Sequence, residues 1–153
     1  MSVERVKKFF EGTEMEGKVI ELSESSATVE LAAEALGTEP DRIAKSLSFL
    51  LDDEAIVIVV SGESRIDNKK YKKHFQKKAK MIPFDSVEYW TGFAPGGVCP
   101  FALKEGVRVY LDESLKKYDT VFPAAGSGNS AIEMTMDQLE RLTGYLEWVD
   151  VVR

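Results

Sequence analysis

The chain has 153 residues, of which 44% are hydrophobic and 30% charged, and this composition predicts one globular domain with its own core. No apolar run approaches the roughly 20 residues that cross a bilayer, and the N-terminus is too highly charged for a signal peptide. One cysteine and one histidine exclude an internal disulfide and disfavour a zinc site, so we expect a cytoplasmic protein without a metal or another cofactor.

The net charge of −6 is unevenly distributed along the chain. Residues 68–80 carry seven lysines and no acidic residue, so the rest of the chain carries −13. An acidic protein ordinarily repels nucleic acid. The lysine run therefore has two interpretations: a helix face exposed to solvent, or a local patch that contacts the phosphates of a tRNA end through Lys69, Lys70, Lys73 and Lys77.

Short helices and short strands alternate along the chain. In chain order, helices are expected over residues 1–12, 27–36, 68–80, 85–92, 113–118 and 135–144. Strands are expected over residues 17–22, 43–51, 55–60, 107–112, 118–125, 131–134 and 145–152. This order, with some strands joined as hairpins, predicts an α+β fold in which short helices flank a mixed, mostly antiparallel central sheet.

Three of the expected helices begin with residues that are suited to capping. Ser25 or Ser26 is placed to cap the second helix, and Asp67 is placed to cap the lysine-rich helix. Thr135 and Gln138 have the spacing of a capping box, in which each side chain accepts a hydrogen bond from the backbone of the other residue. These residues fix the expected starting points of the helices.

The strand over residues 43–51 places a lysine where an apolar residue is expected. Side chains alternate between the two faces of a strand, so Lys45 shares a face with Ile43, Leu47 and Phe49. A charge on an inward-facing row costs several kcal/mol unless it is paired, reaches water or lies in a pocket. Lys45 therefore extends to the surface, protects an exposed sheet edge, or lines a cleft and presents its ammonium to an anionic or carbonyl oxygen.

Two glycine-bearing loops are further candidates for a binding site. The sequence APGGVCPF covers residues 94–101, and AAGSGNSAIEM covers residues 124–134. Neither has the spacing of a Walker loop or of a dinucleotide-binding loop. Paired glycines let backbone N–H groups approach a ligand closely, so these segments are either tight turns or anion-binding loops.

Cys99 and His74 are the only candidates for a thiol–imidazole pair. Cys99 lies in the first glycine loop and His74 in the lysine-rich helix, and nothing in the sequence brings them together. No third residue that would orient the histidine is evident, and there is no nucleophile-elbow motif. A buried cysteine and a surface histidine are the simpler interpretation.

Five segments together resemble the YbaK/prolyl-tRNA-synthetase-associated domain family, small trans-editing factors that hydrolyse mischarged aminoacyl-tRNA. In chain order they are SSATVELAAEALG, RIAKSLSF, AIVIVVSG, TGFAPGGVCPFAL and AAGSGNSAIEMTMDQL. Each segment is a weak motif alone, but their order and spacing match the family over about residues 20–142. The resemblance implies that residues 1–153 form a single domain with the fold of this family.

The resemblance also implies a reaction, partners and site residues. Lys45 occupies the position of the family's pocket lysine and is the expected catalytic residue of an aminoacyl-tRNA deacylase. The expected substrate-binding residues match the family's two glycine loops: Gly96, Gly97, Pro100, Gly126, Gly128 and Asn129. Family members clear alanine or cysteine from proline tRNA, among other pairs. The implied partners are a mischarged tRNA and, transiently, an aminoacyl-tRNA synthetase.

The sequence departs from the family pattern at two positions, and two other functions fit the same residues. Cys99 stands where relatives often have serine, and Ser46 follows the lysine where they often have threonine or asparagine. These differences concern the amino acid that is recognised more than the fold. The alternative functions are a non-catalytic module of the same fold that binds tRNA or a small anion, and a thiol hydrolase that uses Cys99 and His74.

Overall fold

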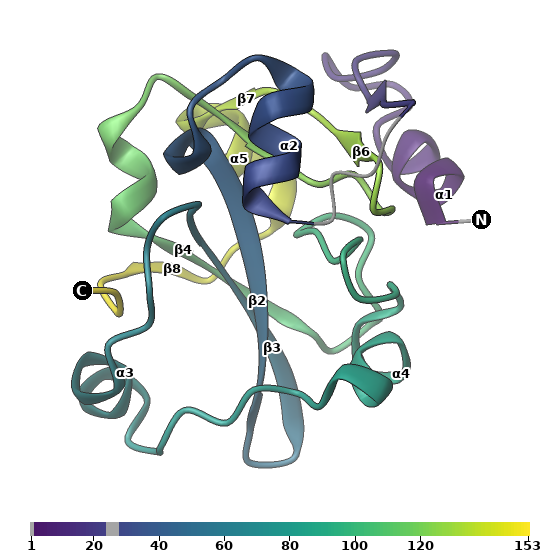
Figure 1. Cartoon of the computed structure of the whole chain (residues 1–153). Helices are drawn as coiled ribbons and strands as arrows, with labels where there is room; N and C mark the ends of the chain where they lie inside the picture. Colours follow the sequence, from purple (N-terminus) through teal and green to yellow (C-terminus); the bar gives the residue numbers. More distant parts are fainter. Residues whose placement is uncertain (1, 24–27) are drawn as a thin grey trace.

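A six-stranded mixed sheet forms the centre of the computed structural model, which describes residues 2–23 and 28–153 (Figure 1). The strand order is β7-β5-β2-β3-β4-β8. In chain order these strands are β2 (Ile43–Leu51), β3 (Glu54–Ser61), β4 (Arg108–Asp112), β5 (Thr120–Pro123), β7 (Met134–Thr135) and β8 (Glu147–Val149). A separate two-stranded sheet pairs β1 (Ile20–Glu21) with β6 (Ser130–Ala131).

The central sheet contains both parallel and antiparallel pairs, so the predicted α+β fold with a mixed sheet is confirmed. The pairs β2–β3 and β5–β7 are antiparallel, whereas β2–β5, β3–β4 and β4–β8 are parallel. The parallel share is therefore larger than the sequence suggested. β3 and β4 can pair in parallel because a long segment connects them, and parallel neighbours need a connection of a dozen or more residues.

β3 is buried on both faces of the sheet. Val57 and Val59 belong to the larger core on one face, whereas Ile56, Ile58 and Val60 belong to the core on the other face. This division follows from the alternation of side chains along a strand. A strand that is covered on both sides has a nearly continuous apolar sequence, which explains why this segment was recognisable from the sequence.

Helices lie on both faces of the sheet. In α3 (Asn68–Phe75), Tyr71 packs on Phe49 with ring centroids 5.2 Å apart. On the opposite face, α1 (Ser2–Phe9) contributes Val6 and α5 (Met136–Thr143) contributes Leu139 to the larger core (Figure 1). Short 3₁₀ helices cover Pro40–Arg42, Phe84–Ser86 and Glu113–Lys117. No helix in the part of the chain that the structure describes is long and apolar enough to cross a membrane.

Two of the predicted helix caps are confirmed. The side chain of Asp67 accepts hydrogen bonds from the first N–H groups of α3, and Thr135 and Gln138 form the complete capping box of α5. The serines that were expected to cap α2 (Val29–Leu36) lie outside the described residues. The N-cap of α2 is Thr28, whose hydroxyl accepts a hydrogen bond from the N–H of Leu31 over 3.2 Å.

Several expected elements are shorter than predicted, and the lysine-rich helix and the strand over residues 131–134 are two clear cases. The lysine-rich helix ends at Phe75 and not near residue 80, because Gln76 adopts a left-handed conformation with φ of 64° and the chain turns back toward β2. The strand expected over 131–134 is divided between two sheets, with Ala131 in β6 and Met134 in β7. Both differences arise from tertiary contacts that the local sequence does not contain.

Candidate active site

The edge of β2 that faces away from β3 is only partly covered. β5 pairs with β2 at Ile43 and Ala44. The segment after α3 joins the same edge further along, where the N–H of Ile82 donates to the carbonyl of Ser48 over 3.1 Å. Between these two points, residues 45–47 have no strand partner on this side among the described residues. The sheet therefore has a gap along one strand edge.

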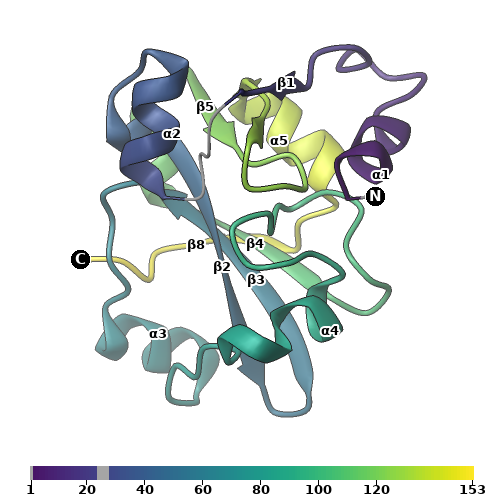
Figure 2. The same cartoon turned by 45° about the vertical axis from the view of Figure 1, so that its right-hand side comes forward.

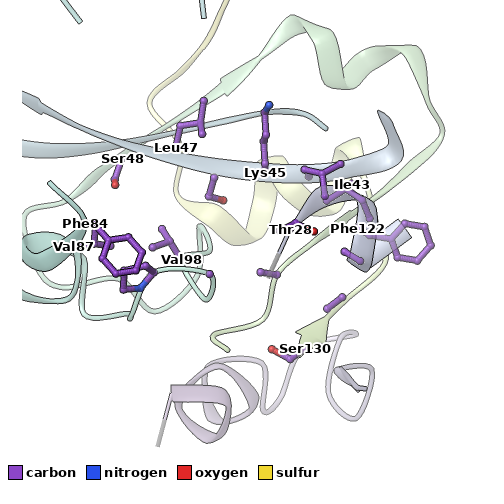
Figure 3. A pocket seen from close by; sticks show the side chains of 18 of the residues that line it. Thr28, Ile43, Lys45, Leu47, Ser48, Phe84, Val87, Val98, Phe122 and Ser130 are labelled. Atoms are coloured by element: carbon purple, nitrogen blue, oxygen red, sulfur yellow. The ribbon is translucent and has the colours of Figure 1, made fainter. Parts of the chain in front are cut away.

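A cavity of about 400 Å³ opens at this gap (Figure 3). It lies between α2 and α4 (Val87–Thr91), which Figure 2 shows near the two ends of β2. Most lining residues are apolar, and those with polar side chains are Thr28, Lys45, Ser46, Ser48 and Ser130. The volume is near the lower end of the range of small-molecule sites, roughly 300–1,000 Å³.

Lys45 lines the cavity at the gap in the sheet edge. Its side chain is half-buried, and its ammonium has no ion pair or hydrogen bond with any residue in the described ranges. Burial lowers the pKa of Lys45, the charge of Arg65 lowers it further, and the charges of Glu30 and Asp41 oppose this effect. Figure 3 shows Lys45 on the opposite side of the β2 ribbon from Ser48. Because the ammonium has no partner among the described residues, it is available to an incoming anion or carbonyl oxygen on the side of β2 opposite Ser48.

Two serines of β2 line the cavity and were not predicted as site residues. Ser48 is only 6% exposed, and the buried Oγ of Ser46 has no hydrogen-bond partner within the described part of the chain. An unmade hydrogen bond at a buried hydroxyl is unfavourable, so this group is suited to a ligand. The sequence signal was present, because small polar residues are unusual on a central strand next to an apolar core.

The first glycine loop lines the cavity through Pro95, Gly96 and Val98, and two further residues of the loop, Gly97 and Pro100, support it from behind. Gly96 lines the cavity and has a φ of 89°, which favours glycine. Gly97 is buried against the second loop, where an added Cβ would lie 2.8 Å from the carbonyl oxygen of Gly126. Pro100 is buried and does not line the cavity. Of the three residues predicted to bind substrate in this loop, Gly96 lines the cavity, and Gly97 and Pro100 lie behind it.

The second glycine loop borders the cavity through Ala124, Ser130 and Ala131, which flank the glycines that were predicted. Gly126 is buried under α1, and an added Cβ there would lie 2.7 Å from the carbonyl oxygen of Ser2. Gly126 and Gly128 do not line the cavity.

Asn129 also lies outside the cavity lining, and it ties the second loop to the segment before α2. The side-chain amide of Asn129 donates to the carbonyl of Leu22 over 3.0 Å, and its backbone carbonyl accepts from the N–H of Leu22 over 2.7 Å. Its side-chain oxygen accepts from the hydroxyl of Ser127 over 2.8 Å. These bonds hold the second glycine loop in position, and a direct contact of Asn129 with substrate stays a prediction.

Cys99 and His74 do not form a catalytic pair. Cys99 is fully buried in the larger core, and burial raises the pKa of its thiol to about 12, which disfavours the reactive thiolate. His74 lies on α3, which covers the other face of the sheet, and its Nε2 lies 2.9 Å from a carboxylate oxygen of Glu147. The structure therefore contradicts the thiol hydrolase that the sequence left open.

Six of the seven lysines of residues 68–80 are exposed and Lys70 is half-buried, so they are not all equally available. Lys70 pairs with Asp150 and Lys77 pairs with Asp52, over 3.1 Å and 3.3 Å. Lys69 and Lys73 have no ion pair with the residues that the structure describes. A surface hollow of about 390 Å³ is lined by Asn68, Lys69, Lys72, Lys78 and Ala79.

A metal centre finds no support in the described ranges of the chain. These ranges contain no cluster of three or more His, Cys, Asp or Glu side chains with the geometry to hold a metal ion. The cavity itself is lined by hydroxyl groups, one ammonium and apolar side chains, which are not the ligands that divalent metals prefer. The cavity is suited to an organic ligand.

Comparisons with known proteins agree in the family that they indicate. The sequence profile of the aminoacyl-tRNA editing domain matches residues 23–142. The Bacillus subtilis protein YwhH is 47% identical over 154 residues, which cover 100% of this chain and 98% of that protein. The Enterococcus faecalis protein EbsC, named as a candidate Cys-tRNA(Pro)/Cys-tRNA(Cys) deacylase, is 32% identical over 79% of this chain and 75% of its own length.

A solved structure is similar over nearly the whole chain. It is described as a candidate trans-editing enzyme for prolyl tRNA synthetase, and it superimposes with a TM-score of 0.88 at 33% identity. The match covers 99% of this chain and 96% of the other. The similarity therefore includes α1 and β8, which lie outside the residues that match the family profile.

Proposed function

The chain belongs to the aminoacyl-tRNA editing domain family, and on this basis we propose that its substrate is tRNA(Pro) mischarged with alanine or cysteine. It is an aminoacyl-tRNA deacylase, which hydrolyses the ester between an amino acid and the terminal ribose of tRNA. The name of EbsC supports cysteine on tRNA(Pro), and the description of the similar solved structure supports the connection with prolyl tRNA synthetase.

The observation that carries the proposal is a small, mainly apolar cavity beside a lysine without an ion pair among the described residues. An apolar synthetase pocket separates amino acids that differ by one methylene by only about 10–200-fold. A second and smaller pocket that hydrolyses the wrong product corrects such errors. The mainly apolar lining of the cavity at the β2 gap, with its volume of about 400 Å³, supports a role in this second selection.

The proposed reaction adds water to an ester that is already activated. The water oxygen bonds to the carbonyl carbon, and negative charge develops on the carbonyl oxygen. The bond to the ribose oxygen then breaks, and that oxygen takes up a proton, so the products are free amino acid and tRNA with a free hydroxyl. Positioning the ester and stabilising the developing charge are sufficient for catalysis of this step.

Two groups are assigned to this reaction. Lys45 anchors the terminal phosphate or the ester carbonyl oxygen with its ammonium. A backbone N–H of the first glycine loop stabilises the developing negative charge, and we assign this role to Gly96, because the N–H of Gly97 already donates to the carbonyl of Ala94 over 3.0 Å. Gly97, Pro100, Gly126, Gly128 and Asn129 are assigned to holding the two loops in place.

Deacylation by the purified protein tests the substrate and the lysine together. We expect hydrolysis of Ala-tRNA(Pro) or Cys-tRNA(Pro) and no hydrolysis of Pro-tRNA(Pro). Lys45→Ala is expected to lower the rate about 100-fold, which is the typical cost of removing one group that stabilises an oxyanion. Lys18→Ala is the matched control, because Lys18 is exposed and does not line the cavity.

Two results would contradict the proposal in different ways. Full activity of Lys45→Ala would remove this lysine from the mechanism while leaving the reaction in place. Binding of tRNA by the wild-type protein without hydrolysis of any mischarged tRNA would identify a non-catalytic module of the same fold.

A transient complex with prolyl-tRNA synthetase, which we also propose, would appear as faster deacylation when the synthetase is added.

A further inference from the structure

Two large apolar side chains are exposed at one end of the cavity. Phe84 is 79% exposed and Met81 is 57% exposed, and both line the cavity. At the other end, Ile43 is 7% exposed and Phe122 is 9% exposed. Figure 3 shows Phe84 with Val87 and Val98 at one end, and Ile43 with Phe122 at the other. The end with Phe84 therefore presents an exposed aromatic ring, whereas the large apolar side chains at the other end are buried.

The two ends are suited to different parts of an aminoacyl-tRNA. The amino acid is the part that the protein must measure, and an enclosed apolar pocket measures size. The terminal adenosine continues into the rest of the tRNA, so it must lie at the end with the exposed ring. Its base is separated from the ester only by the ribose, and it therefore lies beside whatever forms the rim of the cavity.

We propose that Phe84 is a stacking platform for the terminal adenine of the tRNA acceptor end, with Met81 beside it. This inference rests on the proposed function and names how the nucleoside is held in the same site. Every base has a π-face, so stacking on an exposed aromatic ring binds nucleic acid without a hydrogen-bond pattern. Phe84 is thus a binding residue, whereas Lys45 acts on the phosphate or the ester.

The platform is fixed to the sheet by backbone hydrogen bonds. The N–H of Leu50 donates to the carbonyl of Lys80 over 2.9 Å, and the N–H of Ile82 donates to the carbonyl of Ser48 over 3.1 Å. Pro83 then restricts the backbone directly before Phe84. Because this segment is anchored on both sides of Met81, little conformational freedom is lost when a base stacks there.

The charge next to the platform supports a nucleotide as the occupant. The chain that leads into Met81 contains Lys77, Lys78 and Lys80, all of them exposed. Lys78 also lines the surface hollow beside α3. A base on Phe84 therefore places the preceding phosphates of the acceptor strand toward a run of positive charge, which favours tRNA over an uncharged apolar partner.

A set of three substrates with the same amino acid tests the platform: the mischarged tRNA, the 3′-aminoacyl-adenosine and the simple ethyl ester. Phe84→Ala is expected to raise KM for the first two by about 5- to 100-fold, which is the usual range for losing one stacked base. Hydrolysis of the ethyl ester, which has no base, is expected to stay unchanged. Phe84→Trp is expected to restore the wild-type KM.

Tyr89→Ala is the matched control variant. Tyr89 is 71% exposed but does not line the cavity. The centroid of its ring lies 5.5 Å from the ring centroid of Trp90 and 4.9 Å from Nζ of Lys104. Because Phe84 and Tyr89 are both exposed, neither alanine variant removes a core contact. We expect Tyr89→Ala to leave the kinetics of all three substrates unchanged.

The outcomes separate this inference from the proposed function. If Phe84→Ala deacylates mischarged tRNA and aminoacyl-adenosine with an unchanged KM, the stacking role of Phe84 is overturned, while the proposed function stands. If the wild-type protein hydrolyses no mischarged tRNA, the proposed function fails. Calorimetry with the non-hydrolysable 3′-aminoacylamino-adenosine still decides the platform in that case. A Kd that rises at least about fivefold in Phe84→Ala supports it, and an equal Kd overturns it.

Discussion

At the scale of single residues, Gly97 shows how closely the two glycine loops approach each other. The position where a Cβ would stand lies 2.8 Å from the carbonyl oxygen of Gly126 and 3.0 Å from the Cα of Ser127. Both contacts are with backbone, which cannot move aside as a flexible side chain does. Glycine at this position therefore sets the distance between the loops, and through Gly96 it sets one wall of the cavity.

Gly97→Ala is expected to destabilise the protein by about 1–3 kcal/mol, the usual cost of overpacking, and to reduce deacylation at temperatures where the variant is folded. Gly106→Ala is the control for replacing a glycine without a steric clash, because Gly106 has open space around it; its φ of 93° favours glycine, whereas the backbone of Gly97 has no positive φ. Urea unfolding measures the first effect and deacylation the second. Equal activity of the two folded variants would contradict the role of Gly97 in shaping the cavity.

Lys45 and Ser46 show what could be predicted at this scale. The alternation along β2 and the resemblance to the family together singled out Lys45, and the structure places it at the cavity. Ser46 and Phe84 were not predicted as site residues, because their importance depends on which neighbours are missing. The gap beside Ser46 and the exposure of Phe84 are visible only once the chain is folded.

At the scale of elements, a buried carboxylate joins three segments. Asp41 lies in the 3₁₀ helix before β2, and it accepts hydrogen bonds from Lys117 over 2.7 Å, from Tyr118 over 2.8 Å and from the N–H of Glu63 over 2.9 Å. Burial alone would raise the pKa of Asp41, but the bonds to Lys117, Glu63 and Tyr118 outweigh it and lower the pKa to about 2. The charged form is therefore stabilised by folding.

Asp41→Asn is expected to lower the free energy of unfolding at pH 7 by about 2 kcal/mol. Because the pKa is lower in the folded state than in the unfolded state, this stabilisation is complete above about pH 4 and is lost as the pH falls toward 2. Urea unfolding between pH 7 and pH 2 measures it, with Asp53→Asn as an exposed control. A parallel pH dependence in wild type and Asp41→Asn would contradict this role.

Elements with strong local signals were predicted with nearly correct bounds. The hairpin of β2 and β3, the capped helix α5 and the start of α3 depend on alternation and on capping side chains, which are properties of adjacent residues. The end of α3 was predicted five residues too late. The division of residues 131–134 between β6 and β7 was not predicted, because it depends on pairing with β1 and β5. Pairing over long sequence distances leaves little trace in a short segment.

At the scale of the whole molecule, the surface beside α3 is positively charged, whereas the protein as a whole is acidic. Lys69, Lys72 and Lys78 surround the hollow beside α3, which lies on the opposite side of the sheet from α1 (Figure 1). The same lysine run leads to Met81 at the mouth of the cavity. Of the lysines expected to contact tRNA, Lys69 belongs to this hollow, while Lys70 and Lys77 also form surface ion pairs.

Salt dependence tests whether this surface contacts tRNA. The double variant Lys69→Ala/Lys72→Ala is expected to weaken tRNA binding and to reduce the slope of log Kd against log salt by about 1–2, because each phosphate contact contributes roughly 0.7–0.9. Fluorescence anisotropy at several salt concentrations measures the slope. Lys18→Ala is expected to leave it unchanged, and an equal slope in the double variant and wild type would show that these phosphates are not contacted.

The position of the cavity in the molecule could not be predicted from the sequence. It arises where β5 diverges from β2 and where residues 80–82 return to the same edge, so it depends on three segments that are far apart in the chain. The family resemblance supplied the expectation of a pocket, but local patterns alone identified only its lysine and its glycine loops. Composition and charge predicted the class of the protein and the basic surface.

The interrupted pairing along β2 also has a consequence for how such a protein evolves. Side chains at residues 45–47 project beside a strand edge that has no partner in the described chain, so their replacement leaves the ladder with β3 intact. Lys45 and Ser46 belong to no hydrophobic core cluster, so mutations that alter selectivity at these two positions disturb folding less than mutations of Leu47, which packs on the core. Natural selection can therefore retarget the enzyme toward another misacylated product by exchanging a few side chains, while the architecture is inherited unchanged.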